Sequence, residues 1–164
     1  MNYEDLLLDF VRRTRENLQI TDRWRLEHPE ARFNEVTHLI NSMLGFIVLP
    51  KERILDWMRQ VEINSTGIPT WNVAFSLRKD SGVVPVDLRP FVTGIRNAVA
   101  HGSFDFISNG RDINSVRFEH KDRHQSQVLW TVDFELGQLN GFLIHLTNEV
   151  EDACKRRQVR SLGG

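Results

Sequence analysis

The stretch DLRPFVTGIRNAVAHG, residues 87–102, predicts a helix with a defined beginning and end. Asp87 suits the N-cap, and Pro90 is tolerated in the first turn, where its missing N–H is not needed. Gly102 can supply the left-handed residue with which many helices end. At about 100° per residue, one side of this helix is apolar; it carries Leu88, Phe91, Val92, Ile95, Ala98 and Val99. The helix should therefore pack into a core by that side.

The opposite side of the same helix is made of small residues. Thr93, Gly94 and Ala100 lie there with Asn97 and His101. A helix side of small residues lets a second backbone come close. We therefore expect Thr93, Gly94 and Ala100 to form the interface of a homodimer, whose twofold axis would bring two copies of Asn97 and His101 together.

Arg96, Asn97 and His101 are candidate catalytic residues. An arginine offers a fixed fork of donors to a phosphoryl group, and a histidine titrates near neutral pH and can move a proton. The spacing alone is weak evidence, because Arg23 and His28 repeat it without the asparagine, the small residues or the glycine. An alternative stays open, in which Arg96 pairs with a nearby acid and the His101 side chain only caps the helix.

His38 and Asn41 are candidate auxiliary site residues. With other small and polar residues they form a stripe along an otherwise apolar helix predicted at residues 30–48. The stripe could line the same cleft as His101. The alternative is a solvated helix face without a function.

After Gly102 the apolar period changes from that of a helix to that of a strand. In SVRFEH (115–120) and VLWTVDF (128–134) apolar and polar residues alternate, which predicts a β-hairpin. Further helices are expected at residues 3–19, 51–63 and 135–158, and residues 64–86 are interpreted as a long ordered loop. The expected fold is mainly α: a four- to five-helix up-and-down bundle with one β-hairpin inserted, at about 103–134, before the last helix. Residues 1–160 should form a single domain, and 161–164 a frayed tail.

Composition excludes several classes of protein. The formal net charge of −1 leaves no global basic field for nucleic acid, so any such contact must be local. A single cysteine excludes an intrachain disulfide. MNYEDLLLDF lacks the basic start of a signal peptide, and no apolar run approaches the roughly 20 residues that span a bilayer. We expect a cytoplasmic protein with no membrane contact and no cofactor. We also expect no metal, because no cluster of acidic residues and histidines has convincing ligand spacing.

RNAVAHG (96–102), in a mostly helical domain of this size, resembles the signature of the HEPN family (higher eukaryotes and prokaryotes nucleotide-binding). Arg96, Asn97 and His101 match that signature position by position. FNEVTHLINSMLGFIVLPKE (33–52) and the hairpin resemble a plasmid- and phage-defence-associated HEPN subgroup. The resemblance covers about residues 30–155.

The resemblance implies a metal-independent endoribonuclease of toxin or defence type. It would act on an RNA substrate as a homodimer, and an antitoxin or a nucleotidyltransferase partner could restrain it. The 2′-hydroxyl of RNA would attack its own phosphate, with His101 as general base or acid, Arg96 stabilising the phosphorane, and Asn97 orienting His101 or the phosphate. A silent HEPN module that binds a nucleotide, RNA or a protein partner is the alternative.

Overall fold

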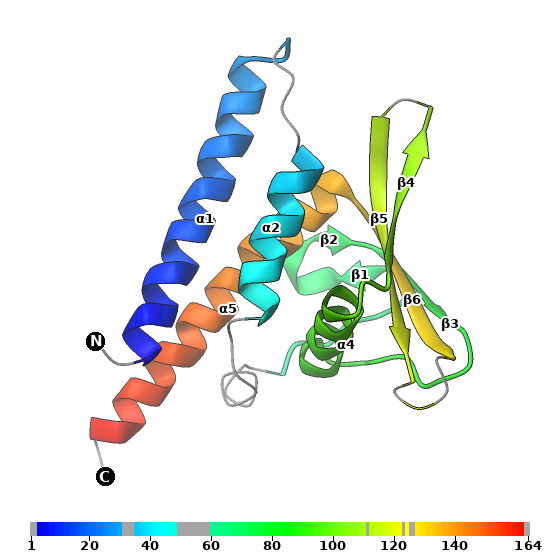
Figure 1. Cartoon of the computed structure of the whole chain (residues 1–164). Helices are drawn as coiled ribbons and strands as arrows, with labels where there is room; N and C mark the ends of the chain where they lie inside the picture. The colour runs from blue at the N-terminus through cyan, green and yellow to red at the C-terminus, as the bar shows by residue number, and fades with distance from the viewer. Residues whose placement is uncertain are drawn as a thin grey trace. The chain divides into compact units, whose positions relative to one another are not determined.

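The computed structural model describes residues 3–30, 35–48, 60–110, 112–122, 124 and 127–162 (Figure 1). The chain divides into two compact units. The helical unit comprises Met1–Arg59 and Leu143–Gly164, and the sheet unit comprises Gln60–Phe142. The last helix, α5 (Leu136–Leu162), begins in the sheet unit and continues in the helical unit.

The helical unit is built from α1 (Tyr3–Glu27), α2 (Glu35–Val48) and the greater part of α5. Steps of three and four residues place one buried side on α1, consisting of Leu7, Val11, Thr14 and Leu18. α2 contributes Leu39 and Met43 to the core, and α5 contributes Leu143, Leu146 and Val150. Each buried aliphatic side chain stabilises the unit by about 1.5–3 kcal/mol relative to exposure.

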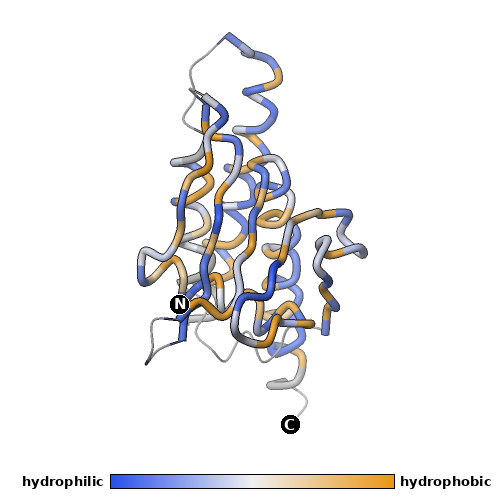
Figure 2. Tube along the Cα trace, turned by 90° about the vertical axis from the view of Figure 1, so that its right-hand side faces the viewer, coloured by the Kyte–Doolittle hydropathy of each residue, from blue (hydrophilic) through white to orange (hydrophobic). Residues whose placement is uncertain are grey.

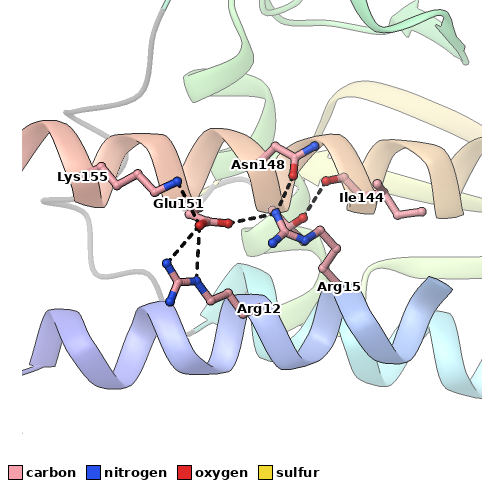
Figure 3. A network of polar contacts seen from close by, with 7 residues as sticks. Arg12, Arg15, Ile144, Asn148, Glu151 and Lys155 are labelled. Carbon is pink, nitrogen blue, oxygen red and sulfur yellow. Dashed lines mark hydrogen bonds and ion pairs between the residues drawn. The ribbon is translucent and has the colours of Figure 1, made fainter. Parts of the chain in front are cut away.

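A buried carboxylate joins α1 to α5 inside the helical unit (Figure 3). The carboxylate of Glu151 accepts hydrogen bonds from Arg12 at 3.2 Å and pairs with Arg15 at 2.9 Å and with Lys155 at 3.0 Å. Arg15 also donates to the side-chain oxygen of Asn148 at 2.7 Å. The buried carboxylate of Glu151 is therefore paired with three cationic side chains, and a buried charge requires such pairing.

The sheet unit contains a four-stranded antiparallel sheet in the order β3-β6-β5-β4 (Figure 1). Its strands are β3 (Ser76–Lys79), β4 (Phe104–Asn109), β5 (Asp112–Lys121) and β6 (Val128–Glu135). The helix α4 (Leu88–Ala100) packs against β5. A small two-stranded sheet, β1 (Gly67–Ile68) with β2 (Val73–Ala74), closes around a 3-10 turn at Pro69–Trp71.

The strand register puts large apolar residues on one face of the four-stranded sheet. Phe118 lies opposite Val132, and Val116 lies opposite Phe134. Phe91 of α4 packs into this face, with its ring centroid 6.3 Å from that of Phe134. The other face is polar and carries an ion pair between Arg117 and Asp133 at 2.7 Å. Figure 2 shows hydrophilic and hydrophobic segments following one another along the strands, as a half-buried sheet requires.

The mainly α bundle expected from the sequence is wrong: the fold is mixed α/β. The expected hairpin is confirmed as β5 and β6, but it belongs to a four-stranded sheet. The expected loop at 64–86 contains β1, β2 and β3, and residues 104–109 form β4. These strands were not predicted because they are short or only weakly alternating, and because β3 pairs with β6, a distant partner in the sequence.

The helices predicted at 3–19, 30–48 and 135–158 are found as α1, α2 and α5, with differences at their ends. The first helix extends to Glu27 rather than residue 19, and α5 continues to Leu162, into the expected tail. Of the helix expected at 30–48, residues 31–34 lie outside the described residues, and 35–48 form α2. Of the expected helix at 51–63, residues 51–59 lie outside the described residues, and Glu62 pairs with Asp87 in a β-bridge. The limits of a single domain at 1–160 stay a prediction. None of the described helices is both long and apolar enough to cross a membrane.

Gly94 sets the distance between α4 and the sheet. A methyl group on Gly94 would overlap the indole ring of Trp130 and would lie 3.3 Å from the His120 ring. Trp130 cannot easily move away, because it is 3 % exposed and packs on Phe91 with ring centroids 5.8 Å apart. The glycine therefore serves packing within the chain.

We expect Gly94→Ala to destabilise the protein by about 1–2 kcal/mol, because overpacking outweighs the gain in helix propensity. Gly141→Ala in α5 is the matched control. The nearest atom to its added methyl group is a Val73 methyl carbon at 3.6 Å, an ordinary contact. That control should gain about 0.5–1 kcal/mol of stability. Urea unfolding of both variants tests this, and equal gains would show that α4 can move off the sheet freely.

Candidate functional site

The C-terminal end of α4 is fixed by its backbone. The N–H of Gly102 donates to the carbonyl of Val99 at 3.2 Å, and the N–H of Ser103 donates to the carbonyl of Ala98 at 2.7 Å. These two bonds form a Schellman motif, which needs a left-handed residue, and Gly102 supplies it with φ +64°. The predicted helix end is confirmed, and His101 is held as the last residue before the turn.

A hollow of about 360 Å³ lies beside this helix end. β5 extends beyond the start of β4, because Phe104, the first residue of β4, pairs with Phe118. Residues 119–121 therefore face the connection between α4 and β4, where the N–H of Glu119 donates to the carbonyl of Ser103 at 2.9 Å. The hollow is lined by Asn97, Ala98, His101, Ser103, Glu119, Lys121 and Asp122.

A second, more open hollow adjoins the first along α4. It shares Asn97, Lys121 and Asp122 with the first hollow, and it continues to Arg89 near the start of the helix. We call the two hollows together the α4 groove. One wall of the α4 groove is α4, and the other is the end of β5 with the start of β6, represented by Leu129.

The structure brings two of the three candidate catalytic residues together. Asn97 and His101, one helical turn apart, line the same hollow, and the His101 side chain is exposed. Arg96 is half-buried and lines neither hollow. Its position differs from that of Asn97 by about 100° around the helix. Among the described residues the Arg96 guanidinium makes no hydrogen bond or ion pair, so no pairing with an acid accounts for it.

The sequence model of the family described as HEPN pEK499 p136 matches residues 1–155. The chain belongs to the HEPN family. Membership points in general to a nuclease or another RNA-related function. Comparison with curated proteins and with solved structures gave no significant match.

The three residues expected at a dimer interface of this HEPN chain lie in different environments. Thr93 lines the second hollow, and its hydroxyl donates to the carbonyl of Arg89 at 2.9 Å. Gly94 is buried against the chain's own sheet. Ala100 is exposed. A dimer interface through these three residues stays a prediction.

His38 and Asn41, the expected auxiliary residues, lie on α2 in the helical unit of the HEPN chain. His38 is half-buried, with its Nε2 atom 3.4 Å from the hydroxyl of Thr21. Burial lowers the pKa of His38, which favours the neutral imidazole. Asn41 is exposed. An auxiliary role for the two residues stays a prediction.

The sequence did not reveal the groove residues that come from the hairpin. Lys121, Glu119 and Asp122 line the hollow with His101, and His120 packs on Trp130 with ring centroids 5.0 Å apart. The available signal was that alternation continues through His120, which puts Glu119 and Lys121 on one face of β5 and His120 on the other. Within the described residues, no group of three or more His, Cys, Asp or Glu could hold a metal ion.

Proposed function

We propose that this HEPN protein is a metal-independent endoribonuclease that cleaves RNA at the hollow lined by His101 and Asn97. One observation carries the proposal: an exposed imidazole, fixed at a helix end, lines a hollow of about 360 Å³ beside a carboxamide. A solvent-accessible histidine at a hollow suits proton transfer. The matching signature Arg96, Asn97 and His101 in a HEPN chain supports this reading.

The proposed reaction is a transesterification within the RNA strand. The 2′-oxygen forms a bond to the adjacent phosphorus, and the bond from phosphorus to the 5′-oxygen of the next nucleotide breaks. The 2′-hydroxyl loses a proton and the leaving 5′-oxygen gains one; His101 performs one of these two transfers as base or acid, and water performs the other. Asn97 orients the imidazole or a phosphoryl oxygen. The products are a 2′,3′-cyclic phosphate and a 5′-hydroxyl, and DNA is no substrate because it lacks the 2′-hydroxyl.

Arg96 enters this scheme through a second copy of the chain. Since Arg96 does not line the hollow of its own chain, we place it at the hollow of a second subunit, where it stabilises the phosphorane. A twofold dimer through the exposed side of α4 would place Arg96 of the partner subunit near His101. A toxin or defence role, with an antitoxin or nucleotidyltransferase restraining the activity, belongs to the same proposal.

The dimer has a direct test in Ala100→Trp. Ala100 is exposed at the end of α4, so the indole should be accepted by the monomer but should block a close twofold contact. We expect light scattering to give a monomer mass for this variant and a dimer mass for the wild type. Val83→Trp, at a residue 88 % exposed, is the control and should stay dimeric. Ala100→Trp dimers would show that α4 is not the interface.

The position of Arg96 also favours one other function. A HEPN module without an arginine at the histidine would bind a nucleotide, RNA or a protein partner without cutting. Incubation of the wild type with structured RNA and with DNA of matching sequence, in EDTA, separates the two functions. The endoribonuclease cleaves only the RNA. Intact RNA in the presence of well-folded dimers would favour the silent module.

A further inference from the structure

We propose that Lys121, at the end of β5, binds a phosphate of the RNA in the α4 groove, and that the β5–β6 hairpin is thereby the second wall of the RNA site. This inference rests on the proposed function, because it concerns the substrate of the same hollow. The signature Arg96, Asn97 and His101 on α4 gives the β5–β6 hairpin no role. Phosphate binding by Lys121 would give it one.

The placement of Lys121 supports this role. Lys121 lines both hollows of the α4 groove, as does Asn97, one turn before His101 on α4. Its ammonium group lies 3.0 Å from the Glu119 carboxylate, and its side chain remains 37 % exposed. An ammonium group has three donors, so Lys121 can keep Glu119 and still donate to a phosphate.

The described residues that line the hollow with His101 include no arginine of the same subunit. Arg96 lies outside it, and Arg89 lines only the second hollow. Among the described residues that line the hollow with His101, Lys121 is the one lysine or arginine. Charge on a phosphoryl group is best stabilised by a donor already in place when the substrate arrives.

Two acidic residues of the hollow, Glu119 and Asp122, would repel a phosphate. Glu119 is neutralised by Lys121, whereas the Asp122 carboxylate accepts the N–H of His124 at 2.7 Å. Without Lys121, a phosphate would meet two carboxylates. Its loss should therefore cost more than the loss of a lysine on an open surface.

The test measures binding separately from cleavage. The probe is a single-stranded, 2′-O-methylated RNA, which cannot attack its own phosphate, and its affinity is measured across a salt series. We expect Lys121→Met to weaken binding about tenfold, and to lower the slope of log K against log salt by about 0.7. Lys79→Met removes the same charge from an exposed position on β3 and should leave both quantities unchanged.

Glu119→Gln distinguishes phosphate binding from a purely structural ion pair. If Lys121 binds phosphate, removal of the neighbouring carboxylate should not weaken binding. If the Glu119–Lys121 pair only holds the hairpin, both variants should weaken binding equally, and that result would overturn the inference. Thermal unfolding of each variant shows whether the fold is kept.

The two proposals fail in different ways. If Lys121→Met binds the 2′-O-methylated RNA with the affinity and the salt dependence of the wild type, the inference about Lys121 is wrong, even where RNA is cleaved and His101 is essential. Conversely, a wild type that binds RNA through Lys121 but never cleaves it would support the inference and overturn the endoribonuclease.

Discussion

Replacement of His101 with alanine is expected to reduce RNA cleavage by about 10³-fold, because general acid–base catalysis by a positioned histidine contributes 10²- to 10⁴-fold. The side chain is exposed, and its backbone turn depends on Gly102, so the variant should fold as the wild type does. Arg96→Ala should cause a comparable loss. Cleavage is measured in EDTA on a labelled RNA, with detection of the 2′,3′-cyclic phosphate end.

The chain contains its own control for this experiment. Arg23 and His28 have the same spacing as Arg96 and His101, but Arg23 lies in the last part of α1 and His28 directly follows that helix. The His28 ring stacks on Trp24 at 4.8 Å and its Nδ1 atom lies 3.1 Å from the Trp24 carbonyl oxygen. His28→Ala should leave cleavage unchanged. Cleavage that survives in His101→Ala, or that is lost equally in His28→Ala, would place the reaction elsewhere or assign it to a contaminant.

Local signals predicted α4 well. The apolar side and the left-handed Gly102 are present as expected, and Asp87 occupies the N-cap position, although its side chain makes no capping hydrogen bond. Such features act within a few residues, so a single sequence contains them in full. The β5–β6 hairpin was predictable for the same reason, because two alternating runs are joined by a short polar link.

The rest of the sheet could not be predicted from local pattern. β3 pairs with β6, so Leu77 lies opposite Val132, more than fifty residues away in the chain. Nothing in SLRK (76–79) indicates such a partner. Pairing between distant strands is decided by the shared core rather than by either strand alone. The mainly α interpretation followed from this omission.

The candidate site was predicted in part. Spacing identified Asn97 and His101 as neighbours, and they do line one hollow. The same reasoning placed Gly94 at a dimer interface, which stays a prediction, and it did not reveal that Trp130 packs against this glycine. A helical wheel shows which side of α4 is least apolar, but not which strand packs there. For this reason Lys121 was missed.

Glu151→Ala is expected to lower the free energy of unfolding by about 2–3 kcal/mol, since removal of one member of a buried ion network leaves the others uncompensated. This loss is smaller than is usual for a buried ion pair, because solvent screens the partners: the side chains of Arg12 and Lys155 are 51 % and 54 % exposed. Asp9→Ala is the matched control. Asp9 pairs with Arg13 on the exposed side of α1 at 2.9 Å, so its loss should cost no more than about 0.5 kcal/mol.

Acid should weaken the same network in the wild type. Burial alone would raise the pKa of Glu151, but hydrogen bonds from Lys155, Arg12 and Arg15 outweigh burial and lower the pKa below its usual 4.5. A carboxyl group whose pKa falls on folding adds stability above its unfolded pKa, and that stability is lost as the pH falls through the folded value. As the pH falls below the unfolded pKa of about 4.5, the free energy of unfolding of the wild type should therefore fall more steeply than that of Glu151→Gln. Urea unfolding across this range measures both slopes, and equal slopes would mean that Glu151 gains nothing from its three cations.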